Sequence, residues 1–377
     1  MDFLSEPPRV DADPEHSMEG VEAVFFEGGP WKGKPTRIFA YYGIPTTQPG
    51  EQVPAMVLVH GGGGSAFIPW VKLWMSRGYA AIAMDTCGCI SGGGHENHTR
   101  HADGGPAGWG GFNQIDEPAE DQWTFHAVSA VIKAHSLLRS YPQVDPARIG
   151  ITGVSWGGYL TCIAAGIDRR FALAAPVYGC GFLTENSTWL GEFEKMKPGG
   201  AECWRRLWDP LNYLPQVECP MLWVNGTNDF AFPMDSWQKS YRLPEGSRTL
   251  SLRMRMAHGH GGPGENPPEI HALAEALFRD GSPLAQITHC SLESGVLAAN
   301  FESKEPITKA ELSYTNDTGP WVDRHWQTMP AELDFSSGTV SAKFPATTTV
   351  CYLNLFDAKD RVVSSEHVES QVGKHPE

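Results

Sequence analysis

The stretch that decides the fold is residues 148–159, RIGITGVSWGGY. Residues 148–154 are rich in β-branched side chains and predict a strand, whereas residues 155–165 begin with small residues and predict a helix. The two meet at Gly153-Val154-Ser155-Trp156-Gly157, which matches Gly-x-Ser-x-Gly in the strand–turn–helix context that this pattern requires. Glycines on both sides leave room for a sharp turn, and the helix N-terminus favours developing negative charge. The segment therefore predicts a nucleophilic serine, Ser155, at the end of a strand.

Strand-length apolar runs alternate with amphipathic stretches on both sides of this turn. Strands are expected at residues 22–26, 37–42, 54–59, 79–84, 171–178, 220–224 and 249–256, and helices at 67–77, 119–141 and 268–279. Such alternation predicts the α/β class, with a mainly parallel sheet flanked by helices. A long glycine-rich segment, 87–118, shows no periodicity, and a segment rich in Trp and Gly, 179–215, is expected to be a cap-like insertion.

The pattern changes at Asp280-Gly-Ser-Pro283, beyond which helical periodicity is lost. Short Thr- and Val-rich runs separated by Gly, Pro and Asp predict a small antiparallel β-sandwich of immunoglobulin or fibronectin III type. We therefore expect a catalytic α/β domain over residues 1–282 and a sandwich over residues 283–377. Cys290 and Cys351 are the one pair that such a sandwich could bridge, although scattered, reduced thiols are the stronger expectation.

Charge and hydropathy exclude several classes of partner. The 377 residues include 29 basic and 44 acidic side chains, a formal net charge of −15, which argues against nucleic acid and anionic membranes. No run approaches the roughly 20 apolar residues that span a bilayer, and the N-terminus lacks a basic, apolar leader. The chain is expected to be soluble and cytoplasmic as written, or secreted or periplasmic if a leader has been removed. Its oligomeric state is left open.

A serine nucleophile needs a histidine base and an acid that orients it, in the chain order serine, acid, histidine. Asp229 follows the strand expected at 220–224, and His258 and His260 follow the strand expected at 249–256. His258 is favoured as the base because it is closer to the strand end and is followed by glycine, with His260 lining the site. Asp235 is a weaker candidate for the acid, since Pro233 predicts that a helix has begun there.

The oxyanion formed during attack on a carbonyl needs two N–H donors. One is expected from Trp156, the residue after the nucleophile, and the other from the turn His60-Gly-Gly-Gly-Gly64. Gly62 is the expected donor, with Gly63 as its alternative. Asp85, at the end of the strand expected at 79–84, is expected to anchor a loop.

With these residues in place, the sequence resembles the α/β-hydrolase superfamily over about residues 20–282. GVSWGGY, residues 153–159, is similar to the nucleophile turn of the prolyl-oligopeptidase and acetyl xylan esterase-like branches. Dienelactone hydrolases share the shape but have cysteine where this chain has Ser155. The resemblance implies Ser155 as nucleophile, Asp229 as acid and His258 as base, in an acyl-enzyme mechanism without a metal or cofactor. No propeller repeat precedes the hydrolase segment and the HGGGG turn is esterase-like, which both weaken the peptidase alternative.

The function predicted from the sequence is a serine carboxylic-ester hydrolase that removes short acyl groups, acetyl above all, from carbohydrate esters. Its substrate is then a small molecule or an oligosaccharide ester. A serine peptidase of prolyl-oligopeptidase type is the alternative. A non-catalytic carbohydrate-binding scaffold is a further one.

Aromatic residues suggest where the substrate binds. Trp109 and Trp189 are the leading candidates, in a pocket wall that also includes Phe112, Trp204 and Trp208. In the sandwich, the segment TGPWVDRHW (residues 318–326) is aromatic enough to stack on sugars, but packing against the catalytic domain is the stronger expectation.

The histidines at 95, 98 and 101 have a spacing that could gather metal ligands on a helix, with Glu96 and Asp103 adjacent. Flanking glycines favour a loop instead, so no metal site is expected.

Overall fold

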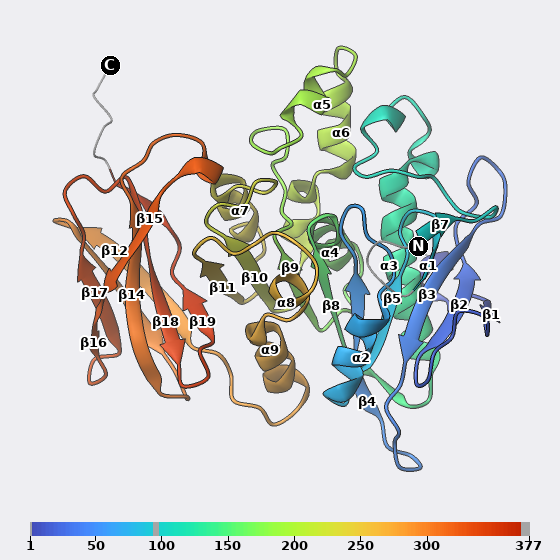
Figure 1. Ribbon diagram of the computed structural model, residues 1–377, viewed down its shortest axis with the longest axis horizontal. Helices are drawn as coiled ribbons and strands as arrows, with labels where there is room; N and C mark the ends of the chain where they lie inside the picture. The colour runs from blue at the N-terminus through green and yellow to red at the C-terminus, as the bar shows by residue number, and fades with distance from the viewer. Residues whose placement is uncertain (1, 93–97, 371–377) are drawn as a thin grey trace.

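The computed structural model describes residues 2–92 and 98–370, and its centre is a nine-stranded sheet with the order β1-β2-β3-β5-β4-β8-β9-β10-β11 (Figure 1). The six strands from β5 to β11 are parallel, whereas β1, β2 and β3 form an antiparallel extension. This confirms the α/β architecture expected from the sequence. The strand bounds are β1 Val10–Ala12, β2 Glu22–Glu27, β3 Arg37–Gly43, β4 Val53–Val59, β5 Ala80–Met84, β8 Val144–Val154, β9 Leu173–Val177, β10 Met221–Gly226 and β11 Arg248–Arg253.

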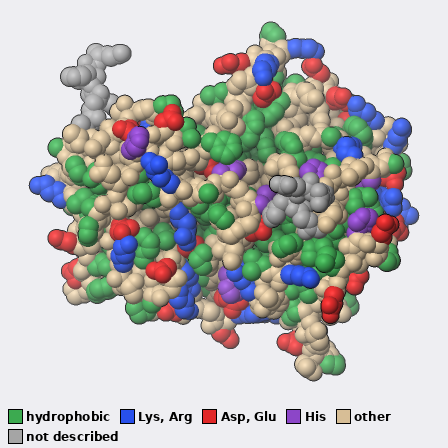
Figure 2. Space-filling model, in the orientation of Figure 1, with side chains coloured by type: hydrophobic (Ala, Val, Ile, Leu, Met, Phe, Trp, Pro, Cys, Tyr) green, Lys and Arg blue, Asp and Glu red, His purple; other side chains and the backbone are tan. Residues whose placement is uncertain are grey.

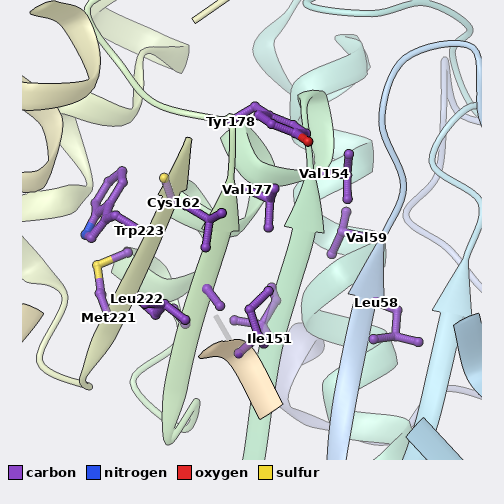
Figure 3. Close-up of a cluster of buried hydrophobic side chains, with 14 of the residues drawn as sticks. Leu58, Val59, Ile151, Val154, Cys162, Val177, Tyr178, Met221, Leu222 and Trp223 are labelled. Atoms are coloured by element: carbon purple, nitrogen blue, oxygen red, sulfur yellow. The ribbon is translucent and has the colours of Figure 1, made fainter. Parts of the chain in front are cut away.

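The central strands are continuous apolar runs because helices cover both faces of the sheet. Every residue of β4, β5 and β9 is buried, as is typical of parallel strands with two covered faces. The register places Val59 beside Gly153 and Val154 beside Val177, so these strands end at one common edge. Figure 3 shows Val59, Val154 and Tyr178 together at that end of the core. The loops that follow β4, β8 and β9 therefore start side by side.

Two groups of helices sandwich the sheet. In Figure 1, α2 (Ile68–Ser76) and α9 (Pro268–Phe278) lie in front of it, and α3 (Trp123–Ser140) packs with α4 (Trp156–Ile167) behind it. The insertion after β9 carries two of the shorter helices and projects above the carboxyl edge. The remaining helices are α1 Asp2–Ser5, α5 Leu190–Glu194, α6 Gly200–Trp208, α7 Met234–Tyr241 and α8 Gly262–Glu265.

The glycine-rich segment 87–118 has more structure than its composition predicts. It contains two short antiparallel strands, β6 (Cys89–Ser91) and β7 (His98–Arg100), and a helical turn at Phe112–Gln114. Helix α3 begins at Trp123, later than expected, because the backbone before it makes a separate turn, Ala119–Asp121, after Pro118.

The C-terminal part is two antiparallel sheets, as predicted, with the orders β12-β13-β17-β16 and β15-β14-β18-β19, and with β20 paired to β18. Their bounds are β12 Gln286–Glu293, β13 Val296–Glu302, β14 Ile307–Thr315, β15 Trp326–Pro330, β16 Glu332–Asp334, β17 Thr339–Lys343, β18 Val350–Asp357, β19 Val362–Ser364 and β20 Val368–Glu369. Cys290 and Cys351 are both free thiols. The boundary at residue 283 stays a prediction.

The sandwich covers the last strand of the large sheet. Strand β19 packs against β11, where the Leu252 N–H donates to Ser364 Oγ at 2.8 Å and Asn354 Nδ2 donates to Leu252 O at 3.2 Å. An edge strand that would otherwise expose unpaired backbone groups is thereby protected. Within residues 2–92 and 98–370, no helix has both the length and the apolar character needed to cross a bilayer.

Candidate active site

Ser155 occupies a sharp turn between β8 and α4. Its backbone has φ 59° and ψ −119°. Residues other than glycine rarely adopt this conformation, because it strains the backbone. A Cβ at Gly153 would collide with Gly157 O, and one at Gly157 would collide with Val59 O. Only glycine fits at both positions, which explains the Gly-x-Ser-x-Gly pattern sterically. The turn leaves Ser155 partly exposed at the start of α4.

Backbone hydrogen bonds hold this turn against its neighbours. The Ser155 N–H donates to Val177 O at 2.9 Å, and Ser155 O accepts from the Tyr159 N–H at 2.9 Å. On the other side, a Cβ added at Gly61 would lie 3.0 Å from Ser155 Cβ. Ser155 is therefore enclosed between the end of β9 and the glycine-rich loop that follows β4.

Asp229 and His258 form a hydrogen-bonded pair at the same edge. Asp229 Oδ2 lies 2.6 Å from His258 Nδ1, and the carboxylate is buried. Asp229 Oδ1 accepts from the N–H groups of Ala231 at 2.9 Å and Phe232 at 2.7 Å. The backbone thus fixes one oxygen and leaves the other for the imidazole. The alternative acid, Asp235, accepts from Asn186 Nδ2 instead.

The His258 ring lies among aromatic side chains. It stacks on Tyr178 with ring centroids 4.5 Å apart, and Phe230 approaches it at 4.7 Å. The Tyr178 hydroxyl donates to Ala257 O at 2.6 Å, and burial raises its pKa, so it keeps this proton. Within the described residues His258 Nε2 makes no hydrogen bond, and Ser155 Oγ is not hydrogen bonded to it. Such bonds are often long before substrate binds.

His260 has a different set of contacts although it lies two residues away. Its Nε2 accepts from the Gly61 N–H at 2.9 Å, so Nδ1 carries the proton and donates to Glu265 Oε1 at 3.0 Å. Glu265 is buried, and its backbone O accepts from Trp70 Nε1 at 3.1 Å. Glu265 and Tyr178 were not predicted from the sequence, because neither belongs to a local motif.

Two backbone amides near the nucleophile are candidates for the oxyanion hole, one in the glycine-rich loop and one at the start of α4. Gly61 N–H is bound to His260, and Gly64 N–H donates to Gly61 O at 3.2 Å. Gly62 is exposed, and a Cβ there would lie 2.8 Å from the Trp156 ring. In residues 2–92 and 98–370, the N–H groups of Gly62 and Trp156 have no protein acceptor. Both expected oxyanion donors are therefore available for a ligand.

His60 and Asp85 hold the loops beneath these amides. The His60 Nδ1–H donates to Gly61 O at 2.9 Å, and Nε2 accepts from the Thr86 N–H at 3.0 Å. Burial lowers the pKa of His60 to about 4, so the ring is neutral at pH 7. Asp85 Oδ1 accepts from the N–H groups of Cys87 and Cys89, both at 2.8 Å, which is the anchoring contact expected for it.

The five aromatic residues proposed as a pocket wall divide into two groups. Trp204 and Trp208 are buried, with their Nε1–H groups donating to Gly110 O and Gln122 Oε1, so they are core residues and that part of the prediction is wrong. Trp109, Phe112 and Trp189 are half-buried, and the ring centroids of Trp189 and Trp156 lie 4.4 Å apart. Their contact with substrate stays a prediction.

The surface around this edge is apolar and rich in histidine. Figure 2 shows hydrophobic side chains gathered below the projecting α5–α6 segment, with histidines reaching the surface beside them. A mixture of apolar walls and a few convergent polar groups is typical of small-molecule sites.

The histidine triplet lies partly outside the described residues, which exclude His95 and Glu96. His98 is exposed on β7, and the His101 ring packs 5.1 Å from Phe25. Among the described residues no group of three or more His, Cys, Asp or Glu is arranged to hold a metal.

Two family models match the chain. The acetyl xylan esterase model matches residues 12–187, and the prolyl oligopeptidase family model matches residues 116–278. A curated relative, the uncharacterized peptidase YuxL of Bacillus subtilis (strain 168), is 25% identical over 238 residues, with 55% of this chain and 33% of YuxL covered. The chain thus spans about a third of the length of that relative.

Solved structures of both kinds resemble the fold. Acetyl xylan esterase from Paenibacillus sp. R4 is 22% identical with a TM-score of 0.58, covering 73% of this chain and 92% of its own. Acetyl xylan esterase 1 from Thermoanaerobacterium sp. JW/SL YS485 is 17% identical with a TM-score of 0.56, covering 74% and 90%. Pyrococcus horikoshii acylaminoacyl peptidase is 23% identical with a TM-score of 0.52, covering 69% and 42%. The matches support a hydrolase, of either the esterase or the peptidase kind.

Proposed function

The chain has the α/β-hydrolase fold, and from that premise we propose that it is a serine carboxylic-ester hydrolase acting through Ser155, His258 and Asp229. The observation that carries the proposal is the Asp229–His258 hydrogen bond of 2.6 Å at the sheet edge where Ser155 sits in its strained turn. A buried carboxylate that orients an imidazole, at the sheet edge that also carries a serine on a sharp turn, is the set of groups that nucleophilic catalysis uses.

In the proposed mechanism, Ser155 Oγ attacks the ester carbonyl carbon while His258 Nε2 accepts the hydroxyl proton. The carbonyl oxygen becomes an oxyanion, which the N–H groups of Trp156 and Gly62 stabilise. Asp229 stabilises the imidazolium. Collapse of the tetrahedral intermediate breaks the bond to the alcohol oxygen, which takes the proton from His258, and leaves an acyl-serine. Water activated by His258 then attacks the acyl-serine and releases the acid.

An ester is favoured over a peptide as the substrate. The likeness to the two acetyl xylan esterases extends over at least 90% of their chains, whereas it extends over 42% of the acylaminoacyl peptidase. The acetyl xylan esterase family model also matches the glycine-rich loop and the serine turn. These observations support removal of a short acyl group, acetyl above all, from a carbohydrate ester, with Trp109 and Trp189 contacting the substrate.

The first test is Ser155→Ala, which is expected to lower p-nitrophenyl acetate hydrolysis by about 10⁴-fold or more without unfolding the protein. Serine-dependent labelling by a fluorophosphonate probe should disappear with it, and circular dichroism checks the fold. Turnover that persists in Ser155→Ala would refute the assignment.

The second test separates esterase from peptidase. Wild-type protein is assayed against esters of increasing acyl length, acetylated xylo-oligosaccharides and aminoacyl arylamides. Fast release of acetate with negligible arylamide cleavage is expected. The opposite preference would establish the peptidase alternative with the same catalytic residues.

A further inference from the structure

Asn228, the residue before Asp229, ties the catalytic domain to the sandwich. Its Nδ2 donates to three backbone carbonyl oxygens, of Trp321 at 3.3 Å, Val322 at 3.0 Å and Arg324 at 2.8 Å. These acceptors belong to the helical turn Trp321–Asp323 and the residue after it, which precede β15. In Figure 1 this turn reaches from the sandwich to a place beside α7, the helix that follows the Asp229 loop.

The turn that receives Asn228 is itself firmly held. The Arg324 guanidinium lies 3.6 Å above the Trp321 ring, and Arg324 Nε donates to Gly319 O at 2.8 Å. Trp321 is buried against the His367 ring, with centroids 5.4 Å apart. The three carbonyl oxygens around the Asn228 amide nitrogen therefore belong to a turn that other contacts already hold in place. The sandwich presents a fixed surface to the loop that carries Asp229.

The amide oxygen of Asn228 is connected through Thr227 to the loop that carries His258. The Thr227 hydroxyl donates to Asn228 Oδ1 at 2.8 Å and accepts from the Arg255 N–H at 3.0 Å. Thr227 is fully buried, and Arg255 has φ 49°, a left-handed conformation three residues before His258. A continuous chain of hydrogen bonds thus joins the sandwich to the segment that carries Asp229 and to the segment that carries His258.

We propose that the C-terminal sandwich fixes the position of the catalytic acid, Asp229, relative to the base, His258. Asn228 is the positioning residue through which the sandwich acts. The inference rests on the proposed function, since it assigns Asp229 and His258 their roles. Asn228 touches no reacting atom, so its effect comes from the orientation of the imidazole. Displacement of a catalytic group by about 1 Å costs up to about 10²-fold in rate, which sets the scale of the effect.

The test is Asn228→Ala, with Gln238→Ala as the matched control. Gln238 also bridges the two parts of the chain, since its Nε2 donates to His367 O at 2.7 Å, but it lies on α7 rather than on a catalytic loop. Asn228→Ala is expected to lower kcat for p-nitrophenyl acetate by about 10-fold with KM changed less than about twofold. Gln238→Ala is expected to keep kcat within about twofold.

Two further measurements identify the route of the effect. The low-field NMR resonance of the His258 Nδ1 proton should shift or broaden in Asn228→Ala and stay unchanged in Gln238→Ala. Thr227→Val, which removes the middle hydroxyl, should lower kcat similarly, and the double variant Thr227→Val/Asn228→Ala should be no slower than the worse single variant. Additive losses would overturn the chain of hydrogen bonds as the route.

Failure of the inference and failure of the proposed function give different results. If Ser155→Ala retains turnover, the proposed function is wrong, whereas the His258 proton still reports whether Asn228 positions the acid and base. If Ser155 is essential but Asn228→Ala matches Gln238→Ala in kcat, labelling rate and the His258 resonance, the inference is overturned. Equal losses of activity and of thermal stability in Asn228→Ala and Gln238→Ala would also overturn the inference, because Asn228 would then contribute only to packing between the two parts of the chain.

Discussion

His258 and His260 lie two residues apart on one loop, and each directs Nδ1 at a carboxylate. His258 pairs with Asp229 at 2.6 Å and His260 with Glu265 at 3.0 Å. The two rings differ at their other nitrogen. His260 Nε2 accepts from the Gly61 N–H, whereas His258 Nε2 makes no hydrogen bond to any described residue. Two similar pairs therefore have different chemical capacities.

The difference teaches that a carboxylate partner alone does not identify a base. A base must also have a second nitrogen free to take a proton from the nucleophile. In the proposed mechanism His258 meets both conditions. His260 uses its second nitrogen to hold Gly61, next to the expected oxyanion donor Gly62, so it acts on the shape of the loop.

Removal of each ring in turn is expected to show the largest difference between the roles of His258 and His260. His258→Ala is expected to lower kcat by about 10⁴–10⁶-fold, because nothing else takes the Ser155 proton. His260→Ala is expected to cost about 10–100-fold, because the loop amides lose their alignment. The two variants are compared by ester turnover and circular dichroism. A larger loss in His260→Ala would exchange the roles of the two rings.

The carboxylates give the next largest contrast. Asp229→Asn should lower kcat by about 10⁴-fold, since an amide in place of the acid favours the wrong imidazole tautomer. Glu265→Gln keeps an oxygen that can accept from His260 Nδ1 and should cost less than about 10-fold. Steady-state kinetics of both variants test this order. Comparable losses would show that both pairs take part in proton transfer.

A third histidine, His60, extends the comparison to a ring that we expect to affect the stability of the fold and not catalysis. Its pKa is about 4 in the folded chain, against an ordinary value near 6.5, because burial disfavours the charged ring. Between these values the unfolded chain binds a proton that the folded chain excludes. Stability should therefore fall as the pH drops from about 6.5 to 4, by about 3 kcal/mol in total, and level off below 4.

The corresponding variant is His60→Asn, which cannot be protonated in this range and keeps an amide N–H at the position of Nδ1, which donates to Gly61 O, while the Thr86 N–H loses its acceptor. Denaturant unfolding of both proteins at a series of pH values gives the slopes. The variant should lose less stability than wild type between pH 6.5 and 4. Equal slopes would contradict the assignment of His60 as an excluded proton site.

The sequence predicted the features that depend on neighbours in the chain. Apolar runs defined the strands of the large sheet, and the glycines around Ser155 predicted a turn that only glycine can flank, because those clashes arise within a few residues. The order serine, acid and histidine, each just beyond a predicted strand, could also be recognised in the sequence, since parallel strands carry their loops to one edge. The sandwich was evident from its strand-length runs and turn residues.

The tertiary structure decided which side chains meet across long separations. Gly61 contacts His260 across 199 residues, and Asn228 reaches Arg324 across 96. No local pattern separates the buried Trp204 from the half-exposed Trp189, because burial depends on what other segments cover. Periodicity and glycine sterics act along the chain, whereas a hydrogen bond between distant residues exists only once packing has brought donor and acceptor together.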